Sequence, residues 1–594
     1  MGLAVFGMAS CGTSDKITEV YNEPDPPVWT LNNDEVELGT TDFLTFDIAR
    51  DDAKLDEKLW TDPSKKIYVE NTDFDDEIGI TYQGEKALVN CDKSSGITVE
   101  ASGAHVTVNA TKDVAVTLTG KSDNGSLKIT GNGKVRINLN GVNLKSGNGP
   151  AINNQSKELC FLVTDSVSML SDDSLYVDAG DSTKMKGCVC SKGKLAISGR
   201  APLKIVAKGA DAIHSGKGIF VRRGSNLDIE SYAGSAIKGK NNVKIEGGLI
   251  NINSMGHGGH GIAAQKKVEI LGGRTTILSH TGVGKNGKNS RGIKSDSIVA
   301  ITGGIARGKE SSVGGKGIRA KKTFLAKNCI VDVLTFGEDD KATGSKNRGI
   351  KAGNELRVDS SRVRVRTENG WNEGLSCDYN IILNNSLVEL STRDDAISAG
   401  TPGKADIEIN NSRVFATAGM DAIDSNGTIH VNSGLIYCIA QSHLCRGFDC
   451  DKAEFKIGPE AVIVSLGQVT SPPTVALLEH PACLVERPLS DTQFCVSTTG
   501  KNDNLVSIQT PKFRFNDSGF TALLSFPEFK QNVSYDFCRK ATVKPQHTFH
   551  GISLGGTVTD KAVSDKHTFT QNYTTLVVSH PTATPKKPAA IAKK

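Results

Sequence analysis

GGHGIAAQKKVEILGGRTTILS, residues 258–279, is one copy of a pattern that repeats on both sides of it along the chain. Each copy begins with a small, an apolar, a variable and another small residue, and continues with two short apolar strands separated by a turn. Successive copies lie mostly 24 to 26 residues apart. Self-similarity at this period indicates a solenoid, in which each coil packs mainly against its two neighbours.

Two columns of residues are predicted to point into the coils. The apolar column contains Cys188, Ile213, Ile237, Ile262, Ile293, Ile318, Ile350, Leu375, Ile397, Ile423 and Phe448. The small column contains Cys190, Ser215, Gly239, Ala264, Ser295, Ala320, Ala352, Cys377, Ala399, Ser425 and Cys450. Because like residues recur in each column, we expect them to stack as internal ladders.

The strands have the chemistry of β structure. Runs such as VKIE at 243–246 and IEIN at 407–410 alternate apolar and polar residues and contain β-branched side chains, without a helical period. Gly-Gly at 272–273 and Asn-Asn at 410–411 stand where the chain must turn sharply, and both residue types tolerate the left-handed conformation. The sequence therefore predicts an all-β fold, a right-handed parallel β-helix whose coils stack about 4.8 Å apart.

The chain divides into five predicted segments. After the Pro-Pro pair at 472–473 the 25-residue period is lost and phenylalanine becomes more frequent, which indicates a β-rich C-terminal cap over the last coil. The segments are a lipoprotein signal remnant (1–11), a tether and N-terminal segment (12–65), the parallel β-helix (66–467), the cap region (468–580) and a disordered tail (581–594).

The first residues, MGLAVFGMASCG, end in a run that resembles the lipobox of bacterial lipoproteins, with Cys11 as the acylated residue. The alternative is a fortuitous run of small residues, since a basic region before the apolar run is missing. No other stretch approaches the roughly 20 apolar residues of a membrane span. We therefore expect a protein of the bacterial cell envelope, held at the outer membrane or cell surface by a lipid anchor and facing outward.

Composition excludes some partners. A net charge of +4 on 594 residues is too small to predict a nucleic-acid partner. The chain has 13 Cys, but Cys188, Cys190, Cys377 and Cys450 fall in the inward columns and are predicted to be buried free thiols. We assign no disulfide and expect a monomer.

Two intervals between copies are longer, each by about six residues. The additional residues lie in HTGVGKNGKNS, 280–290, and GEDDKATGSKN, 337–347. Both segments enter the same position of the repeat, so we expect two polar loops that project from one corner of the solenoid. Projecting loops of this kind often line a binding face.

Basic residues recur at two variable positions of neighbouring coils, which predicts a ligand-binding ladder of cations. Its members are Lys238, Arg291, Lys294, Lys316, Arg319, Arg348 and Lys351. Stacked like charges repel unless an anion lies across them. The alternative is a solvated face that also prevents edge pairing.

Further along the chain the same positions become acidic. These residues are Asp394, Asp395, Asp421, Asp424 and Asp449. Stacked carboxylates could supply the oxygen ligands that Ca²⁺ prefers, so a calcium site is one hypothesis. Ordinary hydrated aspartates at coil corners are the other.

Catalytic patterns are weak. GHGGHG at 256–261 and RDD at 393–395 are similar to pieces of the polygalacturonase signature, but they occur in the wrong order for it. Lyase chemistry would need a basic residue beside a calcium-bound carboxylate, and Arg362, Arg364 and Arg366 could be proposed. Their alternation fits the outward face of a strand better. We assign no catalytic residue.

The runs GNGKVRINLNGVNLKSGNGPAI and KGKLAISG, the repeated RGIK or DAI before VKIEGG, and FPEFKQNVSY resemble a bacterial family of carbohydrate-binding β-helices. The resemblance extends over most of residues 95–580. It implies a pectate-lyase-like shape, calcium, and binding of plant polysaccharides that include cellulose and polygalacturonate. The chain departs from the family in having Arg-Gly-Ile for Asp-Gly-Ile at 291–293 and 348–350, which points to a more cationic binding face.

The leading hypothesis is a surface-anchored protein that binds polysaccharide without cleaving it, with acidic plant glycans such as polygalacturonate, and also cellulose, as ligands. A ladder of exposed side chains suits a polymeric ligand. One alternative is a polysaccharide lyase or hydrolase that acts on acidic glycans. The other is a structural surface adhesin.

Overall fold

The computed structural model describes residues 46–51, 63–92, 95–174, 176, 186–280, 282, 287, 289–452, 454–486, 493–509 and 521–577. Cys11 and the tail 581–594 lie outside these residues. The chain forms two compact units. The first comprises Met1–Asp25, Asp52–Ile229 and Lys244–Ile250, and the second comprises Pro26–Asp51, Glu230–Val243 and Asn251–Lys594.

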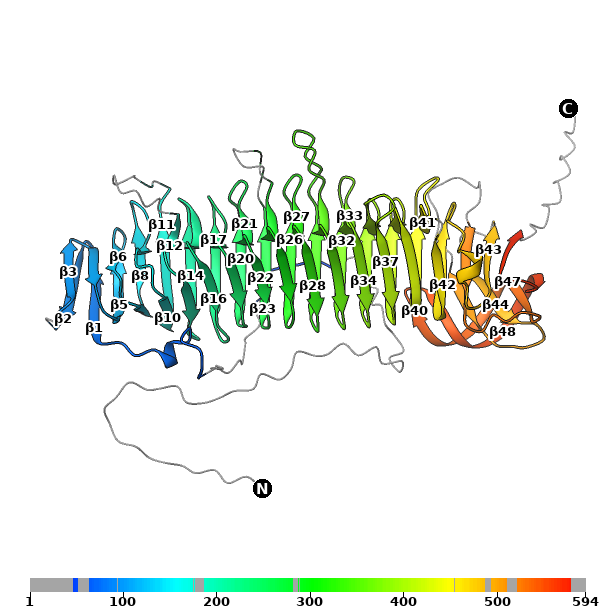
Figure 1. The fold of residues 1–594 in the computed structure, drawn as a ribbon, viewed down its shortest axis with the longest axis horizontal. Coiled ribbons are helices and arrows are strands. Elements are labelled where there is room, and N and C mark those ends of the chain that lie inside the picture. The colour runs from blue at the N-terminus through cyan, green and yellow to red at the C-terminus, as the bar shows by residue number, and fades with distance from the viewer. Residues whose placement is uncertain are drawn as a thin grey trace, which may run out of the picture. The chain divides into compact units, whose positions relative to one another are not determined.

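Most of both units is made of short β-strands in coils of about 25 residues, so the predicted parallel β-solenoid is confirmed (Figure 1). Within the described residues the helical elements are two 3₁₀ turns, Val69–Asn71 and Val475–Leu477. None of the described helices is long and apolar enough to cross a membrane. The right hand of the coils stays a prediction, in line with the general preference of parallel crossovers.

The first unit opens with two antiparallel hairpins, β1–β2 and β3–β4, before parallel coils begin. Its strands are β1 (Asp76–Gln83), β2 (Lys86–Cys91), β3 (Ile97–Ser102), β4 (His105–Ala110), β5 (Val114–Ser122), β6 (Ser126–Gly131), β7 (Val135–Asn140), β8 (Asn143–Ser146), β9 (Ile152–Asn154), β10 (Cys160–Ser166), β11 (Ser168–Asp172), β12 (Gly187–Ser191), β13 (Leu195–Ser198), β14 (Pro202–Ala207), β15 (Asp211–Ser215) and β16 (Gly218–Val221). The unit boundaries fall within β17 (Asn226–Ser231), β19 (Asn242–Ile245) and β20 (Leu249–Ser254).

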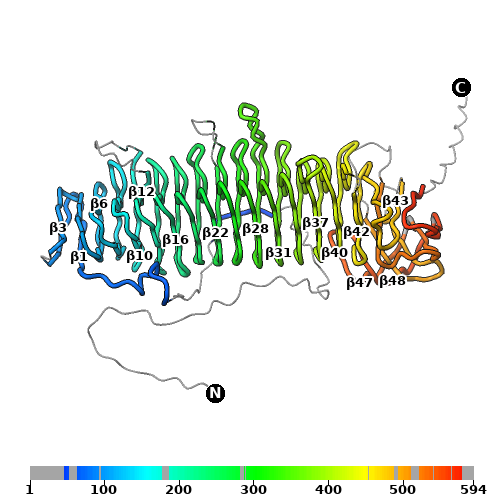
Figure 2. Tube along the Cα trace, viewed as in Figure 1, coloured from blue at the N-terminus to red at the C-terminus, as the bar shows by residue number. Residues whose placement is uncertain are grey.

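In the second unit successive coils lie side by side (Figure 2), and their strands form three rows. The first row contains β18 (Ile237–Gly239), β21 (His260–Ala264), β24 (Arg291–Ser295), β27 (Lys316–Ala320), β30 (Arg348–Ala352), β33 (Glu373–Cys377), β36 (Ile397–Ala399), β39 (Ile423–Ser425) and β41 (Phe448–Cys450). The second contains β22 (Lys267–Ile270), β25 (Ile298–Ile301), β28 (Thr323–Lys327), β31 (Glu355–Asp359), β34 (Asn380–Asn384) and β37 (Asp406–Asn410). The third contains β23 (Arg274–Ser279), β26 (Ile305–Glu310), β29 (Ile330–Thr335), β32 (Arg362–Thr367), β35 (Leu387–Thr392) and β38 (Ser412–Ala418). The long strands β40 (Thr428–Ala440) and β42 (Phe455–Gly467) extend the second and third rows.

The predicted apolar ladder of the second unit is confirmed in register. Ile262 lies opposite Ile293, which lies opposite Ile318, and the series continues to Phe448 with every member buried. Stacking like residues at each coil removes apolar surface from water along the whole row.

The prediction for the early coil at 187–191 was wrong by one residue. Val189 lies opposite Ile213 and Ser191 opposite Ser215, so Cys188 and Cys190 do not belong to the two columns. Both cysteines are nevertheless buried. All five residues of β12 are buried, so the strand has no alternation of buried and exposed side chains that would show the register. The backbone pairing with β15 shows which residues belong to the ladder.

The predicted corner residues adopt left-handed backbone conformations. Gly273 and Gly304 have φ angles of 73° and 69°, and Asn385 and Asn411 have 48° and 41°. Asn411 Nδ2 also donates to Asn385 Oδ1 at 2.7 Å, so the corners of successive coils are hydrogen-bonded to one another. This combination explains why Asn replaces Gly at these turns.

The C-terminal region is β structure, as predicted, but part of it closes on itself. Strands β44 (Gln493–Thr498), β45 (Val506–Gln509), β47 (Ser534–Phe549) and β48 (Ile552–Thr568) form a closed barrel. The other strands are β43 (Ala482–Glu486), β46 (Thr521–Ser525) and β49 (Tyr573–Val577). β46 pairs antiparallel with β42, so the edge of that coil is occupied. All cysteines within the described residues are free thiols.

The third row of the second unit is covered on its outer face. An apolar cluster joins Leu387 and Phe415 of this row to Phe46 and Ile48 near the N-terminus and to barrel residues such as Phe549. The cluster is buried, so this face is occupied by the protein's own chain.

Candidate functional site

The predicted cations of three coils stack in register on the first row. Arg291 lies opposite Lys316 and Lys294 opposite Arg319. On the next coil Arg348 lies opposite Lys316 and Lys351 lies opposite Arg319. Adjacent strands are about 4.8 Å apart, so the six residues form two short columns, called here the cationic rows.

Three of the six cations have carboxylate partners that the sequence pattern did not reveal. Arg348 makes a bidentate pair with Glu373, with Nε–Oε2 and Nη2–Oε1 distances of 2.6 and 2.9 Å. Lys294 Nζ lies 3.3 Å from an oxygen of Asp296, and Lys351 is paired with Asp378. The positive charge of the rows is therefore partly neutralised by the protein itself.

Lys316 differs from the expected exposed cation. Only 5% of its surface is exposed, and its Nζ donates to Ser345 Oγ at 3.0 Å and to the Lys346 carbonyl at 2.7 Å. Burial, reinforced by repulsion from Arg291 and other neighbouring cations, lowers its pKa to about 6. Lys316 is thus mainly neutral at pH 7, because the long loop before β30 covers it.

Arg291 and Arg319 carry most of the unneutralised charge of the rows. Arg291 donates to the carbonyls of Ser290 and Gly314, and burial lowers its pKa to about 10, so it stays protonated at pH 7. Arg319 is half-buried and has no hydrogen-bond or ion-pair partner among the residues that the structure describes. Lys238 is exposed on β18, but it lies opposite Ala263 and is not stacked on a cation.

Carboxylates gather at the far end of the same row. Ser398, Asp424 and Asp449 lie opposite one another on β36, β39 and β41, and Asp395 and Asp421 come just before the first two strands. Asp449 is paired with Arg446, and the Asp421 amide donates to Asp395 Oδ1 at 3.1 Å. The first row therefore changes from cationic to anionic along its length.

Four of these carboxyl groups hold protons more tightly than usual. Burial and, secondarily, neighbouring carboxylates raise the pKa of Asp395 to about 8 and that of Asp424 to about 7. The pKa values of Asp394 and Asp421 are also raised, with burial as the main cause. No group of three His, Cys, Asp or Glu side chains in the described part of the chain is arranged to hold a metal ion. Calcium stays a prediction.

The two long loops leave the third row and enter the first, so they occupy the same corner, as predicted. Residues 337–347, between β29 and β30, rise above the neighbouring strand ends (Figure 1). Of the loop 280–290, the structure describes residues 280, 282, 287, 289 and 290. Asn289 Nδ2 donates to Asp340 Oδ2 at 2.8 Å, so the bases of the two loops are joined.

The arginines considered for lyase chemistry have structural roles. Arg364 forms a bidentate pair with buried Asp332, at 2.6 and 2.7 Å, and Arg362 lies 3.2 Å from Glu389. Arg366 Nη1 donates to the Phe46 carbonyl at 3.0 Å. These contacts tie neighbouring coils and the N-terminal segment to the third row.

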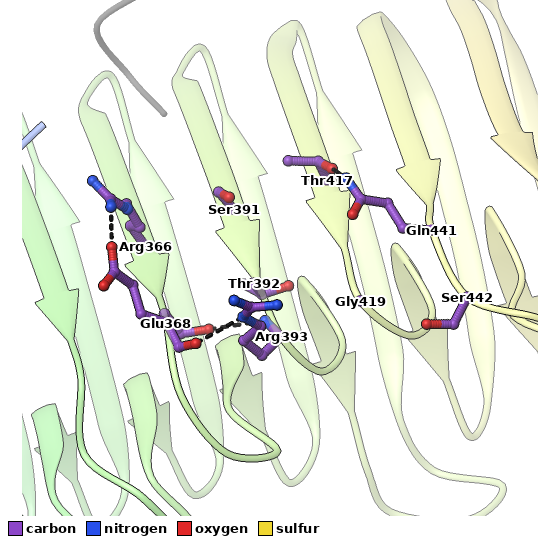
Figure 3. A pocket seen from close by; sticks show the side chains of 10 residues that line it. Arg366, Glu368, Ser391, Thr392, Arg393, Thr417, Gly419, Gln441 and Ser442 are labelled. Atoms are coloured by element: carbon purple, nitrogen blue, oxygen red, sulfur yellow. Dashed lines mark hydrogen bonds and ion pairs between the residues drawn. The ribbon is translucent and has the colours of Figure 1, made fainter. Parts of the chain in front are cut away.

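A hollow of about 450 Å³ lies where β32, β35, β38 and β40 end, at the same corner as the long loops (Figure 3). Its walls are polar and include Arg366, Glu368, Arg393, Gln441 and Ser442. Sequence reasoning noticed Arg393 only as part of Arg-Asp-Asp. Arg366 was considered only for lyase chemistry. Thr367, Thr392, Thr417 and Ser442 recur every 25 residues, and this spacing is the signal that could have indicated a common corner.

Comparison with known proteins gives one family and one solved structure. A family model described as carbohydrate-binding domain-containing protein matches residues 102–340 and again residues 226–443, which together span more than half of the chain. A polysaccharide lyase-like protein from C. thermocellum, solved as a gadolinium derivative, is 18% identical with a TM-score of 0.33, and the match covers 48% of this chain and 96% of that one. No curated protein matches the chain significantly.

Proposed function

Because the chain belongs to the family of carbohydrate-binding domain-containing proteins, we propose that it binds polysaccharide without cleaving it, with acidic glycans such as polygalacturonate, and also cellulose, as its ligands. The observation that carries this proposal is the register of the cationic rows, which repeats a pair of basic residues on three adjacent coils. A linear polyanion lying along the row meets cations at each coil. Polysaccharide is the proposed partner, and nucleic acid is not. The proposed binding form is a monomer.

The contributions of individual cations should be modest. An exposed ion pair contributes about 0–1 kcal/mol, and Lys294, Arg348 and Lys351 already have carboxylate partners. Arg291 and Arg319 should therefore contribute most to the binding of an acidic polymer. Lys316 should contribute little at pH 7, because it is mainly neutral and buried.

Binding of polygalacturonate to the full chain and to Arg291→Ala, Arg319→Ala and the double variant tests this site. We expect the double variant to bind more weakly than either single variant, and wild-type binding to weaken as the Debye length falls from about 30 Å at 0.01 M salt to about 3 Å at 1 M. Cellulose binding should be nearly independent of salt. Lys404→Ala, which removes an exposed cation elsewhere in the second unit, is the matched control. Unchanged binding in the double variant would exclude the cationic rows.

A second candidate function is hydrolysis or lyase cleavage of an acidic glycan. The raised pKa values of Asp395 and Asp424 favour it, since a general acid must be protonated near the working pH. An assay of reducing ends and unsaturated products on polygalacturonate, with and without calcium, distinguishes the two functions. Sustained turnover that is lost in Asp395→Asn would contradict the binding-only proposal.

The proposed location is the outer surface of a bacterial cell envelope, with a lipid on Cys11 as the anchor. Acylation requires the Cys11 thiol. Metabolic labelling with a fatty acid should therefore mark the wild-type protein and disappear in Cys11→Ser. Labelling that survives the substitution would rule out this anchor.

A further inference from the structure

The polar hollow of Figure 3 contains groups that can bind a ligand. Arg393 Nε donates to the Glu368 carbonyl at 2.7 Å, and its two terminal amino groups have no partner within the described residues. Gln441 Nε2 donates to Thr417 Oγ1 at 2.8 Å, which fixes the amide and leaves its carbonyl oxygen as an acceptor. The hydroxyls of Ser391 and Ser442 likewise have no partner in the described part of the chain.

The charge of the hollow is positive. Glu368 is its only lining carboxylate among the described residues, and it is paired with Arg366. This pair leaves the Arg393 guanidinium without a carboxylate. A guanidinium whose two terminal amino groups are open is suited to a bidentate contact with a carboxylate.

An exposed indole lies on the loop that borders the hollow. Trp371 is 58% exposed. Thr367, which lines the hollow, closes this loop by donating its hydroxyl to the Asn372 carbonyl at 2.8 Å. Asn369 and Asn372 donate their side-chain amides to the carbonyls of Phe336 and Gly337, at 2.7 and 3.0 Å. The backbone that presents Trp371 is therefore fixed on both sides.

This combination suits a sugar ring, which has a C–H face and an edge of hydroxyl groups. An aromatic face offers apolar contact for the C–H face, while a few placed polar groups orient the hydroxyls. We propose that the hollow and Trp371 form a separate subsite for about three successive residues of an acidic glycan, because these side chains lie on four coils about 4.8 Å apart. One ring stacks on Trp371, the carboxylate of a neighbouring residue binds Arg393, and hydroxyls of the bound residues bind Gln441, Ser391 and Ser442. The proposal rests on the proposed function and adds a sugar-specific contact to it.

Binding of a short acidic probe to the full chain tests the subsite. The probe is trigalacturonate, and its fully methyl-esterified form is the neutral probe, both titrated calorimetrically. Trp371→Ala should weaken both probes by about two- to tenfold, because the ring loses its stacking surface. Arg393→Ala should weaken only the acidic probe, also by about tenfold. Arg393→Lys should restore part of that loss because it keeps the positive charge. The recovery should be incomplete because an ammonium cannot make the bidentate contact.

Tyr379→Ala is the matched control, because it removes another exposed aromatic, 40% exposed, at the corner between β33 and β34. It should bind both probes as the wild type does. Thermal melting checks that each variant is folded. If Trp371→Ala and Arg393→Ala bind the probes normally while polygalacturonate still binds the wild type, the subsite is excluded and the proposed function stands. If the wild type retains neither the polymer nor the probes, both proposals fail.

Discussion

The Nε2 atom of His550 lies 2.9 Å from Oε1 of Glu389, a carboxylate of β35 with no exposed surface. The other oxygen of Glu389 accepts from Arg362 at 3.2 Å, and the His550 ring stacks on Phe415 with centroids 3.9 Å apart. The turn between β47 and β48 is thereby docked on the third row. This contact helps to hold the turn against the outer face of the third row.

The first prediction concerns this docking contact. His550→Ala removes the hydrogen bond and the stack, and it leaves one oxygen of a buried carboxylate without a partner. Such a loss costs about 1–3 kcal/mol. We expect a lower melting temperature and faster proteolysis between residues 534 and 568. His547→Ala, which removes a histidine of β47 three residues before the turn, is the control and should have little effect. Equal protease resistance in His550→Ala and wild type would contradict the docking role.

The second prediction concerns Lys316. Its pKa of about 6 in the folded state is below the unfolded value of 10.5, so the unfolded state binds more protons between these values and stability rises with pH across the window. Burying the amine in its neutral form costs stability at pH 7, by about 1.4 kcal/mol for each unit by which its pKa is lowered. Lys316→Met removes this cost but also loses two hydrogen bonds. We expect a net gain of about 2 kcal/mol at pH 7 that shrinks toward pH 10. A variant that melts below wild type at pH 7 would contradict this.

The third prediction concerns Asp395, whose effect on stability changes with pH in the opposite direction to that of Lys316. Its folded pKa of about 8 is above the unfolded value of 3.8, so the folded state binds more protons and stability falls as the pH rises through that range. Asp395→Asn keeps an acceptor for the Asp421 amide. The variant should melt higher than wild type at pH 8 and at nearly the same temperature at pH 4. If the melting temperatures of the two proteins differ by the same amount at pH 4 and at pH 8, the effect is excluded.

The fourth prediction concerns calcium. If the carboxylates from Asp394 to Asp449 hold an ion, chelation should lower the melting temperature, since a ligand that binds only the folded state stabilises it by mass action. The response should disappear in the Asp395→Asn, Asp424→Asn double variant, which removes the two carboxylates with the highest pKa values. A melting temperature that chelator and added calcium leave unchanged would remove the ion from this site.

The columns of the solenoid were predictable because each coil adds one repeat of similar length. Positions such as Ile293 and Ile318 therefore fall opposite each other once the repeat is counted. The same counting predicted that Lys294, Arg319 and Lys351 share a column. It failed at Val189, where consecutive buried residues conceal the register. It also gave no sign of the closed barrel, which has no 25-residue period.

The sequence by itself determined which residues share a row, because register in a stack of parallel coils follows from repeat length and from the alternation of buried and exposed side chains. Only the tertiary structure decided which of those residues are charged, paired or accessible. Lys316 is mainly neutral because residues 345 and 346 cover it, and Glu389 is paired because His550, 161 positions away, docks against it. Desolvation and ion pairing depend on distances of a few ångströms between atoms, and the repeat does not encode the distances between residues from different parts of the chain.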